Sequence, residues 1–114
     1  MKEIGGYLEL DQYFLPMLHS EAIALNCGRN CLTYLLKARK IKEILLPKFL
    51  CNSIRDVCQR ENVKIRYYSI NKDFLPEHLC VKPNEWVYFV NYYGQLSNQQ
   101  ITYFSQKYQR IIVD

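Results

Sequence analysis

The sequence lacks the features that mark several large classes of protein. No run of apolar residues approaches the roughly 18 that a membrane-spanning helix needs. The opening Met1-Lys2-Glu3 is not followed by the apolar stretch of a secretory signal. With 49% hydrophobic residues and a formal net charge of only +4, the chain has enough apolar content to fill a core, which excludes a disordered protein. We therefore expect one globular, cytoplasmic domain that does not contact a membrane.

The sequence also gives little support for a metal site, a disulfide framework or nucleic-acid binding. The five cysteines are odd in number, include no CxxC pair and form no set of close ligand pairs with the two histidines. We expect no metal site, and we interpret the cysteines as reduced, small, buried side chains. The basic cluster from Lys37 to Lys42 lies where a helix is expected to end, so it complements the helix dipole. Nucleic-acid binding through this cluster remains a third alternative, but no basic stripe interleaves with the ten tyrosines and we expect no such partner.

The spacing of apolar residues predicts strands that alternate with helices. Strands are expected over residues 22–25, 44–46, 63–67, 86–90 and 111–113. Helices are expected from Asn30, from a cap at Asn52 or Ser53 with Ile54, Val57 and Cys58 facing inward, and from a cap at Ser97 with Ile101, Phe104 and Tyr108 buried. Residues 71–83 carry two prolines and predict a connection with at most one turn of helix.

This alternation predicts an α/β fold of three layers, with a mostly parallel sheet and helices on both faces. Residues 1–20 form a lead-in, with Gly5-Gly6 as a hinge and Pro16 as a breaker. Residues 21–114 form a single domain.

Ligands of such sheets bind beyond the carboxyl ends of the strands, so the residues that follow each apolar run are the candidates. Gly28 lies at the first expected strand-to-helix turn, where backbone N–H groups and the positive end of the helix dipole face a ligand. Arg29 and Asn30 add a charged donor and an amide suited to phosphate oxygens. The pattern indicates an anion site, but an ordinary glycine turn with a surface arginine would look the same. Neither a P-loop nor a GxGxxG motif occurs to decide between them.

Two further positions are candidates. Asp114 directly follows the last expected strand, where its carboxylate could pair with a cation or a protonated ring nitrogen, or could simply be solvated. Tyr92 and Tyr93 follow the 86–90 strand, where they could form the wall of a pocket or merely pack with their hydroxyls in water.

Taken in order, five motifs resemble the opening of the DegT-type aminotransferases, pyridoxal-phosphate enzymes of fold type I that commonly aminate keto-sugars. The resemblance spans nearly the whole chain but only the first portion of the large domain of that family. The motifs are Ile4-Gly5-Gly6-Tyr7-Leu8-Glu9-Leu10, Ala24-Leu25-Asn26-Cys27-Gly28-Arg29-Asn30-Cys31-Leu32, Leu46-Pro47-Lys48-Phe49, Val90-Asn91-Tyr92-Tyr93-Gly94 and Ile111-Ile112-Val113-Asp114.

The resemblance implies a role for each candidate. The turn of Gly28, Arg29 and Asn30 would hold the phosphate of pyridoxal 5'-phosphate, and Asp114 would pair with the pyridine nitrogen and keep the ring an electron sink. Cys51 falls where many relatives place an aromatic residue that stacks on the ring. A cysteine cannot stack in this way, so either a tyrosine of the 92–93 pair substitutes for it or the packing of the cofactor is weakened.

The resemblance also implies what the chain lacks. The Schiff-base lysine of the family lies well beyond the aspartate, so none of the nine lysines takes that role, and the small carboxy-terminal domain is missing. We therefore expect the amino-terminal part of a sugar aminotransferase that does not catalyse transamination alone. Its expected partners are a second copy in a dimer and a complementing carboxy-terminal half. The alternative is a non-catalytic α/β module for phosphate binding or assembly.

Overall fold

The computed structural model describes residues 15–114, so the motif at residues 4–10 and the hinge at Gly5-Gly6 lie outside the described residues. The helices are α1 (Gly28–Ala38), α2 (Asn52–Arg60) and α3 (Asn98–Lys107), with a 3₁₀ turn η1 (Tyr92–Gly94). The strands are β1 (Glu43–Pro47), β2 (Lys64–Ile70), β3 (Pro76–Glu77), β4 (Trp86–Phe89) and β5 (Ile111–Val113).

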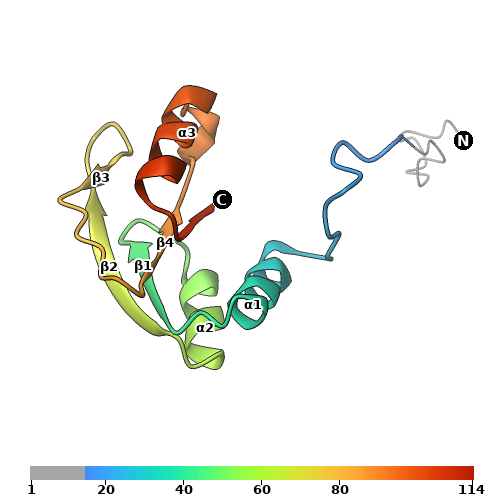
Figure 1. Cartoon of the computed structure of the whole chain (residues 1–114), viewed down its shortest axis with the longest axis horizontal. Helices are drawn as coiled ribbons and strands as arrows, with labels where there is room; N and C mark the ends of the chain where they lie inside the picture. The colour runs from blue at the N-terminus through green and yellow to red at the C-terminus, as the bar shows by residue number, and fades with distance from the viewer. Residues whose placement is uncertain (1–14) are drawn as a thin grey trace, which may run out of the picture.

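The strands form one sheet in the order β3-β2-β1-β4-β5 (Figure 1). All neighbours pair in parallel except β2 and β3, which pair antiparallel through Ser69 and Ile70. The connection from β1 to β2 runs through α2, and the connection from β4 to β5 runs through α3 in the opposite direction along the sheet. Because parallel crossovers are right-handed, helices that connect in opposite directions cover opposite faces. The sequence-based prediction of a mostly parallel α/β sheet with helices on both faces is confirmed.

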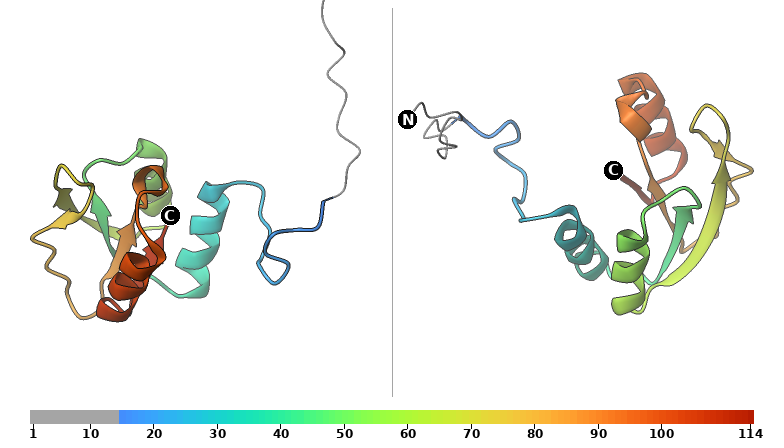
Figure 2. Two further views of the ribbon diagram at one scale, coloured as in Figure 1. Left: turned by 90° about the horizontal axis from the view of Figure 1, so that it is seen from above. Right: turned by 180° about the vertical axis from the view of Figure 1, so that it is seen from behind.

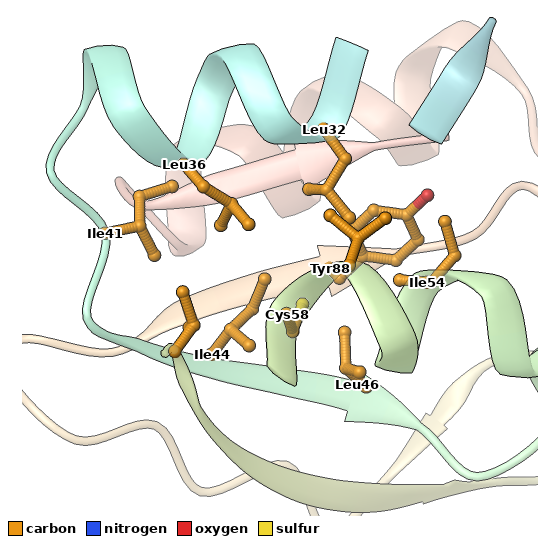
Figure 3. Packing of buried hydrophobic residues seen from close by; sticks show 10 residues of the cluster. Leu32, Leu36, Ile41, Ile44, Leu46, Ile54, Cys58 and Tyr88 are labelled. Atoms are coloured by element: carbon orange, nitrogen blue, oxygen red, sulfur yellow. The ribbon is translucent and has the colours of Figure 1, made fainter. Parts of the chain in front are cut away.

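The larger core lies between the sheet and the first two helices. Leu32 and Leu36 of α1 pack with the α2 residues Val57 and Cys58, over Ile44 and Leu46 of β1 (Figure 3). β1 supplies the centre of the sheet, and its residues from Ile44 to Pro47 are all buried. These apolar side chains leave water together, which is the main force that holds both helices on this face.

The opposite face has a smaller core. Leu45, Tyr68 and Val87 form its buried cluster. Phe104 of α3 packs on Phe89 of β4, with ring centroids 4.7 Å apart. Phe89 alternates with Tyr88 along β4, so consecutive residues of this strand serve the two different cores.

Local signals in the sequence explain where the helices begin. Ser97 accepts a hydrogen bond from the backbone N–H of Gln100, whose side chain accepts one from the backbone N–H of Ser97. This capping box confirms the predicted start of α3. The inward face of α2 is also as predicted, with Ile54, Val57 and Cys58 buried. Both predicted caps of α2, Asn52 and Ser53, were wrong, by one and two residues, because Cys51 occupies the N-cap position and makes no side-chain capping bond.

Three other expectations were wrong. Residues 22–25 form no strand; they are exposed in a segment that leads away from the sheet and helices (Figure 2). A short apolar run becomes a strand only if a neighbouring strand pairs with it, and this run has none. Within residues 71–83, Pro76 and Glu77 form the short strand β3. The α3 residues Ile101, Phe104 and Tyr108 are only partly buried.

A buried ion pair fixes the loop that precedes β4. Glu85 is only 2% exposed, and its two carboxylate oxygens accept hydrogen bonds from Nε and Nη2 of Arg66, both at 2.7 Å. The backbone N–H of Lys82 donates to the same carboxylate at 3.0 Å, and Arg66 also donates to the carbonyl of Cys80. The pair therefore ties residues 80–85 to β2.

Candidate functional site

A cavity of about 600 Å³ lies beyond the carboxyl ends of β4 and β5. The first turn of α1 contributes Gly28 and Arg29 to its lining, the N-cap of α2 contributes Cys51, and the residue after β5 contributes Asp114. Four of the five predicted site residues thus meet around one cavity, although they come from three distant parts of the chain. Its apolar wall consists mainly of Leu32, Leu35, Leu50, Ile54 and Ile112.

The start of α1 brings to this cavity backbone N–H groups that have no acceptor within the helix, of which that of Arg29 also donates to the Cys27 thiol. The first N–H groups of a helix have no acceptor within the helix, and those of Gly28 and Arg29 occupy these positions. No acidic residue lies in the first turn. A Cβ placed on Gly28 would meet nothing within 4 Å, so the space beside this turn is open. The donors, the helix dipole and the Arg29 guanidinium together favour an anion.

Asp114 is held by the sheet and by a tyrosine. Its backbone N–H donates to the carbonyl of Phe89 at 2.9 Å, and its carbonyl accepts from the N–H of Asn91 at 2.8 Å. The hydroxyl of Tyr88 donates to Oδ2 of Asp114 at 2.8 Å. Burial, with the carboxylate of Asp114 as the next cause, raises the pKa of Tyr88, so the hydroxyl remains a donor. A carboxylate oriented in this way is suited to accept a hydrogen bond from a protonated nitrogen.

Two thiols line the same cavity at helix N-caps. The Sγ of Cys51 lies 2.6 Å from Oγ of Ser53, and hydrogen bonds from the side chain and backbone of Ser53 lower the pKa of Cys51. The pKa of Cys27 is lowered chiefly by the backbone N–H of Asn30, with the side chain of Arg29 adding to the effect. The expectation that all five cysteines are buried was wrong, because only Cys58 is buried. All five are free thiols.

Other candidates lie elsewhere. Asn30 does not line the cavity, and its side-chain amide donates to Oδ1 of Asn26 at 2.6 Å. Tyr92 also lies outside the lining; its ring stacks on Phe49 at 5.5 Å, and its hydroxyl donates to the carbonyl of Phe49. Tyr93 is 78% exposed and packs edge-on against Phe74. Neither tyrosine therefore forms the wall of this cavity.

Sequence reasoning missed Tyr88 as a functional residue. Within an apolar run its aromatic ring reads as core, and the alternation along β4 does turn the ring into the larger core. The signal available was its hydroxyl, because a buried tyrosine hydroxyl needs a hydrogen-bond partner.

Among residues 15–114, no group of three or more His, Cys, Asp or Glu side chains is arranged to hold a metal ion. No helix in the same described part of the chain is long and apolar enough to cross a membrane.

Comparison with known proteins supports the fold. No protein-family model and no curated protein matches the chain. Its structure is similar to the crystal structure of a candidate aminotransferase from Burkholderia pseudomallei, with a TM-score of 0.58 and 14% sequence identity. The match covers 75% of this chain but only 29% of that protein. The chain therefore has the fold of one part of an aminotransferase-like protein, and it spans less than a third of the length of that neighbour.

Proposed function

We propose that this chain is the amino-terminal part of the large domain of a pyridoxal-phosphate-dependent aminotransferase. One observation carries the proposal: the first turn of α1, with Gly28 and Arg29, and the carboxylate of Asp114 after β5 line one cavity. The similarity to an aminotransferase-like fold supports it independently.

The residues present fit this cofactor. The N–H groups of Gly28 and Arg29, with the Arg29 guanidinium, suit a phosphate group. Asp114, oriented by Tyr88, suits a protonated ring nitrogen. The volume of about 600 Å³ lies within the range of small-molecule sites, and the apolar wall suits the faces of a ring. When bound, pyridoxal phosphate supplies the electron sink for amino transfer, and this chain holds and orients its two polar ends.

The catalytic lysine is proposed to come from outside this chain. None of the lysines among residues 15–114 lines the cavity; Lys48 is nearby, but it lines an adjacent cavity beside α2. We therefore expect no transamination by the chain alone. The proposed substrate of the complete enzyme, a keto-sugar, rests on the resemblance to the DegT-type family.

The second candidate function is a non-catalytic module that binds phosphate or assembles with a partner. Two features favour it: the lining residues include no lysine, and Cys51 stands where, by the resemblance, many DegT-type aminotransferases have an aromatic residue. Such a module would bind phosphate at the start of α1, and Asp114 would take no part in the binding.

A binding experiment separates the two functions. The reduced chain is titrated with pyridoxal phosphate, pyridoxal and inorganic phosphate, and binding is followed by absorbance and thermal shift. For the aminotransferase part we expect pyridoxal phosphate to bind more tightly than phosphate. Arg29→Gln should weaken both by about tenfold or more, since a charged hydrogen bond is worth about 1.5–3 kcal/mol. Asp114→Asn should weaken pyridoxal phosphate alone.

Arg39→Gln, at the other end of α1, is the matched control and should leave binding unchanged. Borohydride trapping and peptide mapping identify any lysine adduct formed away from the cavity. Equal affinity for phosphate and pyridoxal phosphate, unaffected by Asp114→Asn, would support the binding module. No stabilisation by any of the three compounds would overturn both the aminotransferase part and the phosphate-binding module.

A further inference from the structure

The thiol of Cys51 lines two neighbouring cavities, and cationic side chains lie in both linings, although Arg55 also pairs with Asp56 at 3.5 Å. It lines the candidate site of about 600 Å³ and also a second cavity of about 380 Å³ beside α2. Arg29 lines the first cavity, and Lys48 and Arg55 line the second. The one carboxylate of the two linings, Asp114, is hydrogen-bonded to Tyr88.

Three of the five thiols gather around the candidate site. Cys27, Cys31 and Cys51 all line the larger cavity, and none of them is buried. Hydrogen bonds at the start of α2 lower the pKa of Cys51, and the positive charge of Arg29 adds to this effect. Thiols that react at neutral pH occupy partly exposed, electropositive surroundings of this kind.

We propose that Cys51 is a site of S-thiolation by an anionic low-molecular-weight disulfide, and that the adduct blocks the candidate cofactor site. The Cys51 thiolate attacks one sulfur of the disulfide, a new S–S bond forms, and the old S–S bond breaks. The other half leaves as a thiolate with the bonding electron pair. Cys51 is thus oxidised and half of the disulfide is reduced. The surrounding cations attract the negative charge of the reagent, and the attached group then fills the cavity.

The chain contains its own comparison thiols. Cys80 is exposed and lines neither of these cavities, but it lies beside Arg66, which is paired with Glu85, so it reports the reactivity of an exposed thiol near a neutralised cation. Cys58 is buried, and burial raises its pKa to about 11, so it reports unfolding. The blocking effect rests on the proposed function, whereas the reactivity of Cys51 does not.

The test treats the reduced chain with glutathione disulfide near pH 7 and maps the adducts by mass spectrometry over time. We expect Cys51 to be modified at least about threefold faster than Cys80, because the rate of exchange rises with the fraction of the thiol that is ionised. Arg29→Gln should slow the reaction at Cys51, and Arg39→Gln should not. A neutral disulfide, bis(2-hydroxyethyl) disulfide, should show a smaller preference for Cys51 over Cys80.

Equal rates at Cys51 and Cys80, or a rate at Cys51 that Arg29→Gln does not change, would overturn the proposal. Cys51→Ser should remove the fast adduct and keep the fold, because serine is a favoured N-cap residue. The thiolated chain should also lose binding of inorganic phosphate and pyridoxal phosphate. If the unmodified chain binds neither compound, the proposed function fails while the ratio of rates at the two thiols still tests the reactivity.

Discussion

Replacing Arg66 with methionine should destabilise the fold through the carboxylate of Glu85. Arg66→Met leaves a group that is 2% exposed with only the N–H of Lys82 as a partner. Arg66 is itself 37% exposed, but removing the partner of a buried charge costs about 3 kcal/mol, because the Glu85 carboxylate then keeps a single backbone donor. For a domain of this size, that loss lowers the Tm by roughly 10–20 °C.

The pH dependence of stability tests the contribution of the Arg66–Glu85 pair in a second, independent way. The hydrogen bonds from Arg66, joined by that from Lys82, hold the pKa of Glu85 below its ordinary value. Its contribution to stability is therefore complete above the unfolded-state pKa of about 4.3 and is lost as the pH falls through the lower folded-state pKa. Glu85→Gln should destabilise the protein at pH 7 and give a flatter stability profile below about pH 4.5.

Urea unfolding at pH 7 and pH 3 measures both effects. Lys37→Met is the control, because Lys37 pairs with Glu61 at 3.5 Å while remaining 68% exposed, and its loss should cost less than about 0.5 kcal/mol. The double variant Arg66→Met with Glu85→Leu should recover part of the lost stability, since no charge is then left buried. A loss below about 1 kcal/mol for Arg66→Met would refute the reasoning, because a truly uncompensated buried charge costs more than that.

Four further predictions concern the site and its supports. Tyr88→Phe removes the donor to Asp114 and should cost about 1 kcal/mol in urea unfolding, whereas Tyr34→Phe on the exposed face of α1 should cost nothing measurable. Gly28→Ala should weaken phosphate binding several-fold in the titration, because the added methyl group lies beside the proposed phosphate site. It should change the free energy of unfolding by less than about 0.5 kcal/mol, because the new Cβ meets only open space. An unchanged affinity would show that phosphate does not bind at Gly28. Ser97→Ala should destabilise the chain by about 1 kcal/mol through loss of the capping box, as measured by thermal unfolding against Ser105→Ala. Stability should fall above about pH 10, because burial raises the pKa of Tyr68, Tyr88 and Tyr92 and the unfolded chain ionises first. Replacing Tyr68 and Tyr88 with phenylalanine should remove most of this alkaline dependence and leave the part that comes from Tyr92.

The sequence predicted those parts of the fold that local patterns determine. Apolar runs and period-two or helical spacings located β1, β2, β4, β5 and all three helices, and Ser97 marked the start of α3. The strand predicted over residues 22–25 does not form, because a strand also needs a neighbouring strand to pair with, and no local pattern shows whether one is present. β3 was missed for the opposite reason, because its two residues pair with Ser69 and Ile70 despite a proline.

The candidate site was predictable to the extent that topology alone fixes it. Gly28, Arg29, Cys51 and Asp114 converge because the ends of parallel strands and the starts of helices meet at one edge of the sheet. The direction of each side chain was not predictable. Asn30 turns to a near neighbour, and the rings at 92 and 93 pack with aromatic residues from other loops. Both outcomes depend on side-chain rotamers and on contacts between loops, which the spacing of residues along the sequence does not determine.

The order of strands in the sheet has a consequence for how this site can change over evolution. β1 comes first in the sequence but lies in the middle, with β2 on one side and β4 on the other. The connections that leave β1 and β4 run through α2 and α3 to opposite faces of the sheet. A hollow therefore opens beyond the carboxyl ends of these two neighbouring strands, whatever side chains line it. Replacing Arg29, Cys51 or Asp114 with residues of similar size would change the polar groups of the lining without filling that hollow. A scaffold of this kind can therefore pass from catalyst to binding protein, and back, through a few substitutions at its rim while the core under β1 stays unchanged.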